Sequence, residues 1–226
     1  TPQTITVTGV DDTTLDGDIT TTLTGTASNT GGYEGNETDT ISITNSDNEI
    51  AGITIEQTGI DDGSGNLLTT EAGGSTTFTV VLDAKPTANV TVTISGDDDS
   101  EHTLSTSSLP FTPSNWDTPQ TVTVTGVDDT TLDGDITTTL TASASATGGF
   151  DGSETASTTV ITTDDDSAGI TITQTGSTDD SGNLLTTEDG GSSDFAVVLD
   201  KQPTANVTVS ISGNDDSEHT LSHSSL

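Results

Sequence analysis

Apolar and polar residues alternate along most of this chain. Short segments carry an apolar residue at every second position, as in TITVT near the start and at Phe78, Val80 and Leu82. That period belongs to a β-strand with one face in a core. The alternating residues are mainly Val, Ile and Thr, which suit a pleated, half-buried surface. The pattern therefore predicts an all-β protein.

The alternation is regular enough to place individual strands. Turns are expected where Gly and acidic residues cluster, at 61–66, 96–101, 128–135 and 147–154. Short strands at this spacing favour a two-sheet sandwich of about seven strands. Within residues 51–166 the expected strands cover 53–58, 75–83, 89–96, 102–106, 119–126, 135–143 and 155–163.

The sequence repeats itself. TPQTITVTGVDD from Thr1 returns as TPQTVTVTGVDD from Thr118, an offset of 117 residues (118 minus 1) that continues without a gap to Leu226. A period of this length suits one small sandwich domain. We therefore expect a window on a longer tandem array. It consists of the C-terminal part of one repeat at 1–50, a complete repeat at 51–167 and the N-terminal half of a further repeat at 168–226.

The copies differ at two neighbouring positions. Ala84 aligns with Lys201, and Lys85 aligns with Gln202. An internal Lys–Asn isopeptide bond needs a lysine at one fixed position in every copy. Because no position holds lysine in both copies, we do not expect that cross-link.

Charge narrows the function classes. The chain has 2 Lys+Arg against 37 Asp+Glu, a formal net charge of −35. Such a balance excludes a reader of the nucleic-acid backbone and a basic membrane-surface helix. No apolar run approaches the length of a membrane span. High charge with 27% hydrophobic residues is also typical of disorder, but the strand-like alternation favours a folded chain whose acid is neutralised.

The acidic residues gather at loop ends. Neighbouring residues in a strand point to opposite faces, so an acidic pair converges only where the strand ends. Bare carboxylates roughly 4–5 Å apart repel by about 3–4 kcal/mol at an effective dielectric constant near 20. Calcium neutralises such clusters because it takes 6–8 oxygen ligands. The absence of Cys and the presence of only 3 His argue against zinc and copper.

Several segments, in their order, resemble a Calx-β domain, the calcium-binding module of sodium/calcium exchangers, integrin β4 and very large bacterial surface proteins. These segments are DDDSAG before a strand, FTVVLDAKPTANVTVTIS, LPFTPSNWDTPQTVTVTGVDD and LDGD. The resemblance implies tandem immunoglobulin-like sandwiches with calcium at the end nearest the next domain. In the complete repeat it implies the ligands Glu71, Asp97, Asp98, Asp99, Asp128, Asp129, Asp133, Asp164, Asp165 and Asp166.

The resemblance extends to the two partial repeats. It implies Asp11, Asp12, Asp16, Asp47 and Glu49 in the first piece, and Glu188, Asp215 and Asp216 in the third. The first piece departs from the family pattern because SDNE stands where the triple Asp is expected, so fewer ions are expected there. Ile136 is a second departure, since family members often carry an acid after this turn.

Other candidate sites favour simpler interpretations. The segment DDGSGN at 61–66 is interpreted as a Gly-rich turn rather than a second calcium site. His102 and His219 are expected at the surface or at strand ends rather than as metal ligands. Catalysis is not expected, because no nucleophile motif such as GxSxG occurs.

These observations predict a calcium-binding structural repeat region of a long adhesin, matrix or surface-filament protein, extracellular and exported from a bacterium. Calcium at the domain junctions would stiffen the array. The expected partners are neighbouring repeats and, in a filament or matrix, like chains. A regulatory calcium sensor and a carbohydrate- or ice-binding module remain as alternative hypotheses.

Overall fold

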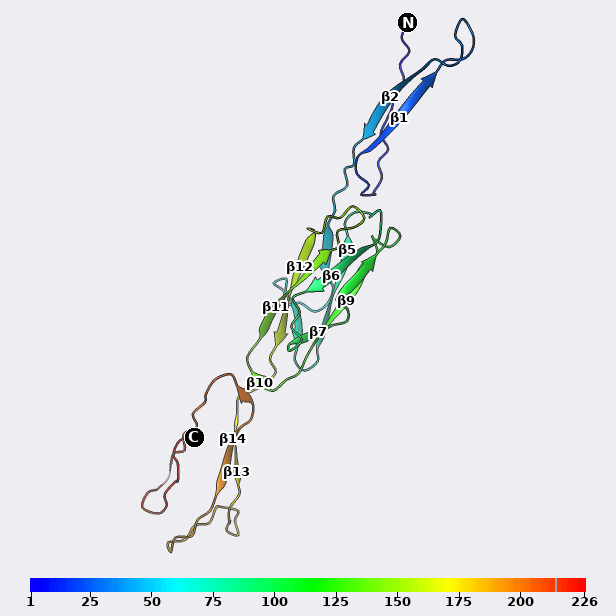
Figure 1. The fold of residues 1–226 in the computed structure, drawn as a ribbon. Helices are drawn as coiled ribbons and strands as arrows, with labels where there is room; N and C mark the ends of the chain where they lie inside the picture. Colours follow the sequence, from blue (N-terminus) through cyan, green and yellow to red (C-terminus); the bar gives the residue numbers. More distant parts are fainter. Residues whose placement is uncertain (214) are drawn as a thin grey trace.

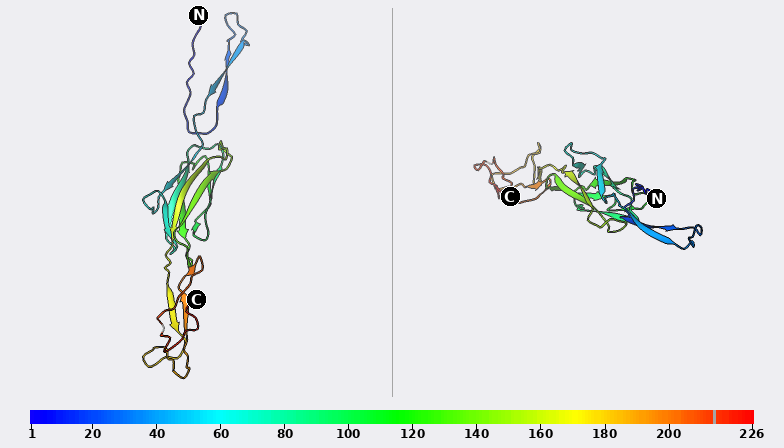
Figure 2. Two further views of the ribbon diagram at one scale, coloured as in Figure 1. Left: turned by 90° about the vertical axis from the view of Figure 1, so that its left-hand side faces the viewer. Right: turned by 90° about the horizontal axis from the view of Figure 1, so that it is seen from above.

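The computed structural model describes residues 1–213 and 215–226, and it is elongated. Figure 1 shows three parts in succession: an N-terminal hairpin, a central two-sheet body and a C-terminal hairpin, and Figure 2 shows the same order from two further directions. The N-terminal hairpin pairs β1 (Ile19–Thr26) with β2 (Thr38–Asn45), and the C-terminal hairpin pairs β13 (Ile170–Gln174) with β14 (Phe195–Leu199). Among the described residues, no helix is long and apolar enough to cross a bilayer.

The central body is a β-sandwich, as the alternation predicts. One sheet has the strand order β4-β12-β11-β6-β8 and the other has the order β3-β5-β9-β7. Every neighbouring pair is antiparallel except β4 and β12, which run parallel. The strands are β3 (Ile53–Gln57), β4 (Leu67–Thr70), β5 (Ser75–Leu82), β6 (Val90–Ser95), β7 (His102–Leu104), β8 (Ser108–Phe111), β9 (Gln120–Gly126), β11 (Ile136–Ala144) and β12 (Thr155–Thr163).

The core lies between these two sheets. Phe78 and Val80 of β5 and Val122 of β9 come from one sheet, and they meet Val92 of β6 and Val160 of β12 from the other. All five are fully buried, and burial of such a side chain contributes about 1.5–3 kcal/mol. The Thr residues between them point outward, which is the reason for the alternation in the sequence.

Two strands differ from the predicted set. The strand β4 follows the 61–66 turn so closely that its four residues show little alternation, and it was not expected. The strand β8 contains Pro110, which weakens a strand prediction. In the structure β8 is the edge strand of its sheet, where a missing N–H is tolerated.

The sequence pattern of the central strands recurs in the terminal pieces, but no second sheet covers it there, and residues 1–12, with the alternating segment TITVT, form no strand. Val122 and Val124 are fully buried, whereas their equivalents Ile5 and Val7 are 87% and 53% exposed. The strand pairing divides the sheets near the expected boundaries, since the two large sheets lie within 53–163. The boundaries at 50/51 and 167/168 themselves stay a prediction.

Two short backbone contacts join the three parts. Thr14 forms a parallel bridge with Lys85, and the two-residue strands β10 (Thr131–Leu132) and β15 (Gln202–Pro203) pair in parallel. The residues of the second contact lie 117 positions after those of the first. We call these contacts the first and second junctions, and we call residues 11–17 and 128–134 the first and second junction loops.

Candidate functional site

Two buried glutamates lie near the second junction. Glu71 directly follows β4 and is 2% exposed, and Glu101 directly precedes β7 and is 6% exposed. The Oε2 atom of each is buried and accepts no hydrogen bond. Burial of an unpaired carboxylate is costly unless it is protonated or finds a cation. These two buried carboxylate oxygens without a hydrogen-bond partner are the strongest local sign of a binding site.

Further carboxylates act on both glutamates. Burial raises the pKa of Glu71 to about 7, and repulsion from Asp164, Glu101, Asp129 and Asp133 adds to the effect. Burial also raises the pKa of Glu101, with repulsion from Asp133 as the next cause. Five acidic groups from separate segments of the chain therefore share one electrostatic environment at this end of the sandwich.

Hydrogen bonds to carboxylates hold the second junction loop in shape. The Thr131 N–H donates to Asp129 Oδ1 at 2.6 Å, and the Gly134 N–H donates to Asp164 Oδ2 at 2.8 Å. Asp164 Oδ1 also accepts the Asp166 N–H at 2.7 Å. The candidate ligands Asp129 and Asp164 are thus tied to the backbone on either side of Leu132.

A lysine from the following repeat reaches this cluster. Lys201 forms an ion pair with Asp166, whose side chain is 3% exposed and whose Oδ2 atom accepts no hydrogen bond. The hydrogen bond to Asp166 raises the pKa of Lys201, and Asp128 and Asp165 act in the same direction. Three of the predicted ligands therefore lie around an ammonium group.

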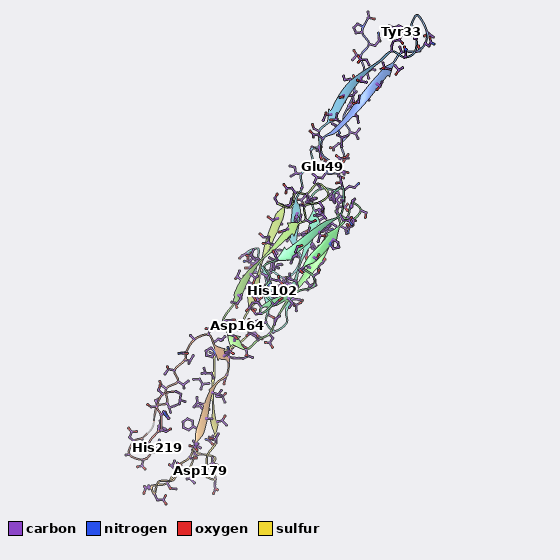
Figure 3. The ribbon with its side chains drawn as sticks, in the orientation of Figure 1. Tyr33, Glu49, His102, Asp164, Asp179 and His219 are labelled. Atoms are coloured by element: carbon purple, nitrogen blue, oxygen red, sulfur yellow. The ribbon has the colours of Figure 1, made fainter. Side chains whose placement is uncertain are left out.

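The first junction repeats this arrangement. The Thr14 N–H donates to Asp12 Oδ1 at 2.7 Å, and the Gly17 N–H donates to Asp47 Oδ2 at 2.6 Å. Figure 3 shows Glu49 at the end of the central body opposite Asp164. All five acids predicted here line one cavity of about 260 Å³: Asp11, Asp12, Asp16, Asp47 and Glu49.

The remaining predicted ligands lie elsewhere. Asp97, Asp98 and Asp99 occupy an exposed turn, where Asp98 Oδ1 accepts the N–H and hydroxyl of Ser100, and this bonding lowers the pKa of Asp98. Asp98 is near enough to repel Glu101, but it is not among the groups that act most on Glu71. The triple acid therefore borders the cluster rather than joining it.

The acids of the third piece lie in its own turns. Glu188 and Asp216 line a cavity of about 410 Å³ together with Glu218 and His219. Asp215 accepts hydrogen bonds from the N–H and hydroxyl of Ser217. Glu188 and Glu218 are the 117-residue equivalents of Glu71 and Glu101, so the same pairing of segments recurs.

Glu101 is the residue that the sequence-based ligand list omitted. A signal was available, because Glu101 is the last acid of the turn and directly precedes a strand, as the other clustered acids flank strands. Burial of its side chain depends on how the turn folds back over the sandwich end, which the local sequence does not display.

Two simpler predictions have different outcomes. His102 is the first residue of β7, which confirms the strand-end alternative, but it is completely buried, with Nδ1 at 3.4 Å from Thr162 Oγ1, so the surface alternative is wrong. Burial lowers its pKa, which favours the neutral imidazole. At 61–66, Asp62 accepts hydrogen bonds from Ser64 and Asn66, as expected of a Gly-rich turn stabilised by an Asp side chain.

The cluster is not a finished coordination shell. Among the residues that the structure describes, no group of three or more His, Cys, Asp or Glu side chains stands at the spacing of a formed metal site. The donors are all oxygens, which suit calcium, and two of them are buried without a partner.

Comparison with known proteins leaves the family open. No protein-family model and no curated protein sequence matches the chain. Among solved structures, the chain is similar to the apo-form Calx CBD1 domain, with 18% identity over 51% of this chain and 99% of that chain and a TM-score of 0.34. It is also similar to surface layer protein SbsC, domains 1–6, with 21% identity, 75% and 24% coverage and a TM-score of 0.35.

A third similar structure is the YadV chaperone, with 12% identity, 55% and 62% coverage and a TM-score of 0.36. Identities and TM-scores this low carry no functional argument. The all-β fold rests on the hydrogen-bonded strands of the chain itself.

Proposed function

We propose that this chain is a calcium-binding structural repeat region of a long extracellular protein, in which calcium at each junction stiffens the array. The observation that carries the proposal is the pair of buried, unpartnered oxygens of Glu71 and Glu101. They lie beside Asp129, Asp133 and Asp164 at the end of the sandwich that faces the next repeat. The function is mechanical, and we propose no catalytic role.

Within this proposal the chain's own residues supply the ligands. Glu71, Glu101, Asp129, Asp133 and Asp164 would hold the ion at the second junction, and the acids that line the first-junction cavity would hold it there. A bound divalent cation supplies positive charge that offsets carboxylate repulsion and favours the ionised form of each ligand. Because it binds the folded arrangement, it also stabilises that arrangement by mass action.

The proposed location follows from the same chemistry. Weak oxygen-only sites are saturated by the millimolar calcium found outside cells. Sites that repeat every 117 residues add length and stiffness rather than one tuned response, which favours a surface filament, adhesin or matrix protein over a sensor. The Calx-β resemblance of the sequence supports calcium binding in either role. Export from a bacterial cell is part of this proposal.

Calorimetric titration with calcium tests the binding. We expect uptake of more than one ion by the 226-residue chain, with a rise in melting temperature and a narrower range of lengths in small-angle X-ray scattering. Asp129→Asn should weaken binding, whereas Asp62→Asn, in a turn outside the cluster, is the matched control and should not. If calcium addition gave no heat of binding and changed neither the melting temperature nor the length of the chain in solution, the proposal would be overturned.

A further inference from the structure

The loops that carry the acidic residues are also the loops that dock on the next repeat. At the first junction the Leu15 N–H donates to the Lys85 carbonyl at 2.9 Å, and the Lys85 N–H donates to the Thr13 carbonyl at 3.0 Å. These two hydrogen bonds form one short parallel bridge between the N-terminal piece and the central sandwich. Acid and docking contact therefore belong to one segment of the chain.

The side chain of Leu15 extends this contact into the central sandwich. Leu15 is partly buried and packs against the apolar core of that body. A Cβ atom added to Gly149 would lie 2.8 Å from Cγ and Cδ2 of Leu15, so Leu15 rests directly on the Gly149 backbone. Gly149 also has a φ of +98°, a conformation that residues with a Cβ rarely adopt. The following repeat thus presents a glycine surface shaped to receive a leucine.

The second junction has the same register. The Gln202 N–H donates to the Thr130 carbonyl at 3.0 Å, and Leu132 pairs with Pro203. Leu132 also lines an apolar cavity of about 470 Å³ with Leu199, Pro203 and Val207 of the following repeat. Leu132, the equivalent of Leu15 after 117 residues, thus occupies the same place in the contact.

The acidic side chains hold the docking segment from both sides. At the first junction Asp12 binds the backbone of Thr14, just before Leu15, and Asp47 binds the backbone of Gly17, just after it. At the second junction Asp129 and Asp164 bracket Leu132 in the same way. A cation that draws these carboxylates together therefore also acts on the position of the leucine between them.

We propose that Leu15 and Leu132 are positioning residues that couple cation binding in each junction loop to docking on the next repeat. The inference rests on the proposed function, and it adds the route by which a bound cation stiffens the array. Coupling of this kind is reciprocal, so docking must raise calcium affinity by the same factor as calcium favours docking. Removal of the leucine should separate the two events.

A labelled chain tests the coupling directly. The sequence contains no Cys, so cysteines introduced at Thr24 on β1 and Thr93 on β6 carry two spin labels across the first junction. In the unsubstituted chain we expect calcium to narrow the distribution of distances between the labels. In Leu15→Ala we expect calcium still to bind, with affinity reduced about fivefold or more, and the distribution to stay broad.

Three controls keep the result specific. Leu23→Ala makes the same truncation on β1, where the side chain is 45% exposed and away from the contact, and should behave as the unsubstituted chain. Leu15→Met should restore much of the narrowing, because it restores an apolar side chain of similar volume. Fluorescence of Trp116, in the central sandwich, verifies that each variant keeps its fold.

The outcomes separate the two proposals. If calcium narrows the distance distribution in Leu15→Ala as much as in the unsubstituted chain, the coupling is overturned and the proposal of calcium binding stands. Absence of calcium binding in the unsubstituted chain overturns the proposed function and the coupling with it. Binding retained in Leu15→Ala with the narrowing lost supports both.

Discussion

The two junctions share a backbone but differ in charge. Both use the same parallel bridge and the same bracketing of a leucine by two aspartates. At the second junction Lys201 places an ammonium group against Asp166, whereas the equivalent position at the first junction is Ala84, which is buried and uncharged. The same loop design therefore meets an ammonium group in one copy and an uncharged side chain in the other.

The second junction also borders two deeply buried acids. Glu71 and Glu101 are buried in the central sandwich, close enough to Asp129, Asp133 and Asp164 for repulsion to raise the pKa of each glutamate. Deep carboxylates gain more from a cation because they have lost more hydration. The predictions below separate the contribution of these glutamates from that of Lys201.

Glu71→Gln should have the largest effect. The pKa of Glu71 is raised to about 7, so in the absence of calcium the folded chain loses stability as pH rises from the ordinary value of 4.5 through 7. The variant lacks this loss and should be more stable above pH 7 by about 2 kcal/mol, allowing for solvent screening. Below pH 4.5 the two should be alike.

Urea unfolding across pH 4 to 8, in chelator, measures this difference. Saturating calcium should reverse the order above pH 7, because Gln removes one charged ligand. If the unsubstituted chain and Glu71→Gln were equally stable at every pH, burial of Glu71 would not raise its pKa, and the prediction would be wrong.

Lys201→Ala makes the second junction resemble the first. Removal of the ammonium group leaves Asp166, Asp128 and Asp165 without their cation, so we expect calcium affinity at the second junction to rise about tenfold. Calorimetric titration at low ionic strength measures the change. An unchanged or lower affinity would mean that Lys201 helps to form the calcium site instead of competing for it.

Ala84→Lys makes the converse change at the first junction. The introduced ammonium group would face Glu49, which occupies the position of Asp166, and calcium affinity there should fall about threefold. The effect is smaller because the first-junction acids are more exposed to water. Combined with Lys201→Ala, the substitution should exchange the affinities of the two junctions, which titration of the double variant would reveal.

Lys85→Gln should have the smallest effect. Lys85 joins the first junction through its backbone N–H and carbonyl, and its equivalent Gln202 makes the same contact. We expect calcium affinity and stability to change by less than about 0.5 kcal/mol. A larger change, seen by the same titration and by thermal unfolding, would show that side-chain charge at this position also contributes to docking.

Local pattern was sufficient for much of the fold. Alternation placed β5, β6, β9, β11 and β12 within a residue or two of their observed bounds. Successive side chains of a strand point to opposite faces, so a strand with one buried face alternates apolar and polar residues along its whole length. It missed β4, which is too short to show a period, and β8, where Pro110 is acceptable only because the strand lies at an edge. Edge position is a property of the sheet and is not visible in the strand itself.

The candidate site was less accessible from the sequence. Clustering at strand ends identified the junction loops and Glu71, because acid at a strand end stands out against alternating Thr and Val. It also included Asp97, Asp98 and Asp99, which stay in an exposed turn, and it omitted Glu101, which is buried beside them. Burial depends on which surface a turn folds against, and that surface comes from distant residues.

The sequence by itself determined the all-β class, the 117-residue period and the loops in which acid is concentrated, because each of these is written in neighbouring or regularly spaced residues. Only the tertiary structure decided that Glu101 joins Glu71, that His102 lies in the core, and that Lys201 meets Asp166. These pairings join segments that lie 30 or more residues apart, and only the packing of strands brings them together.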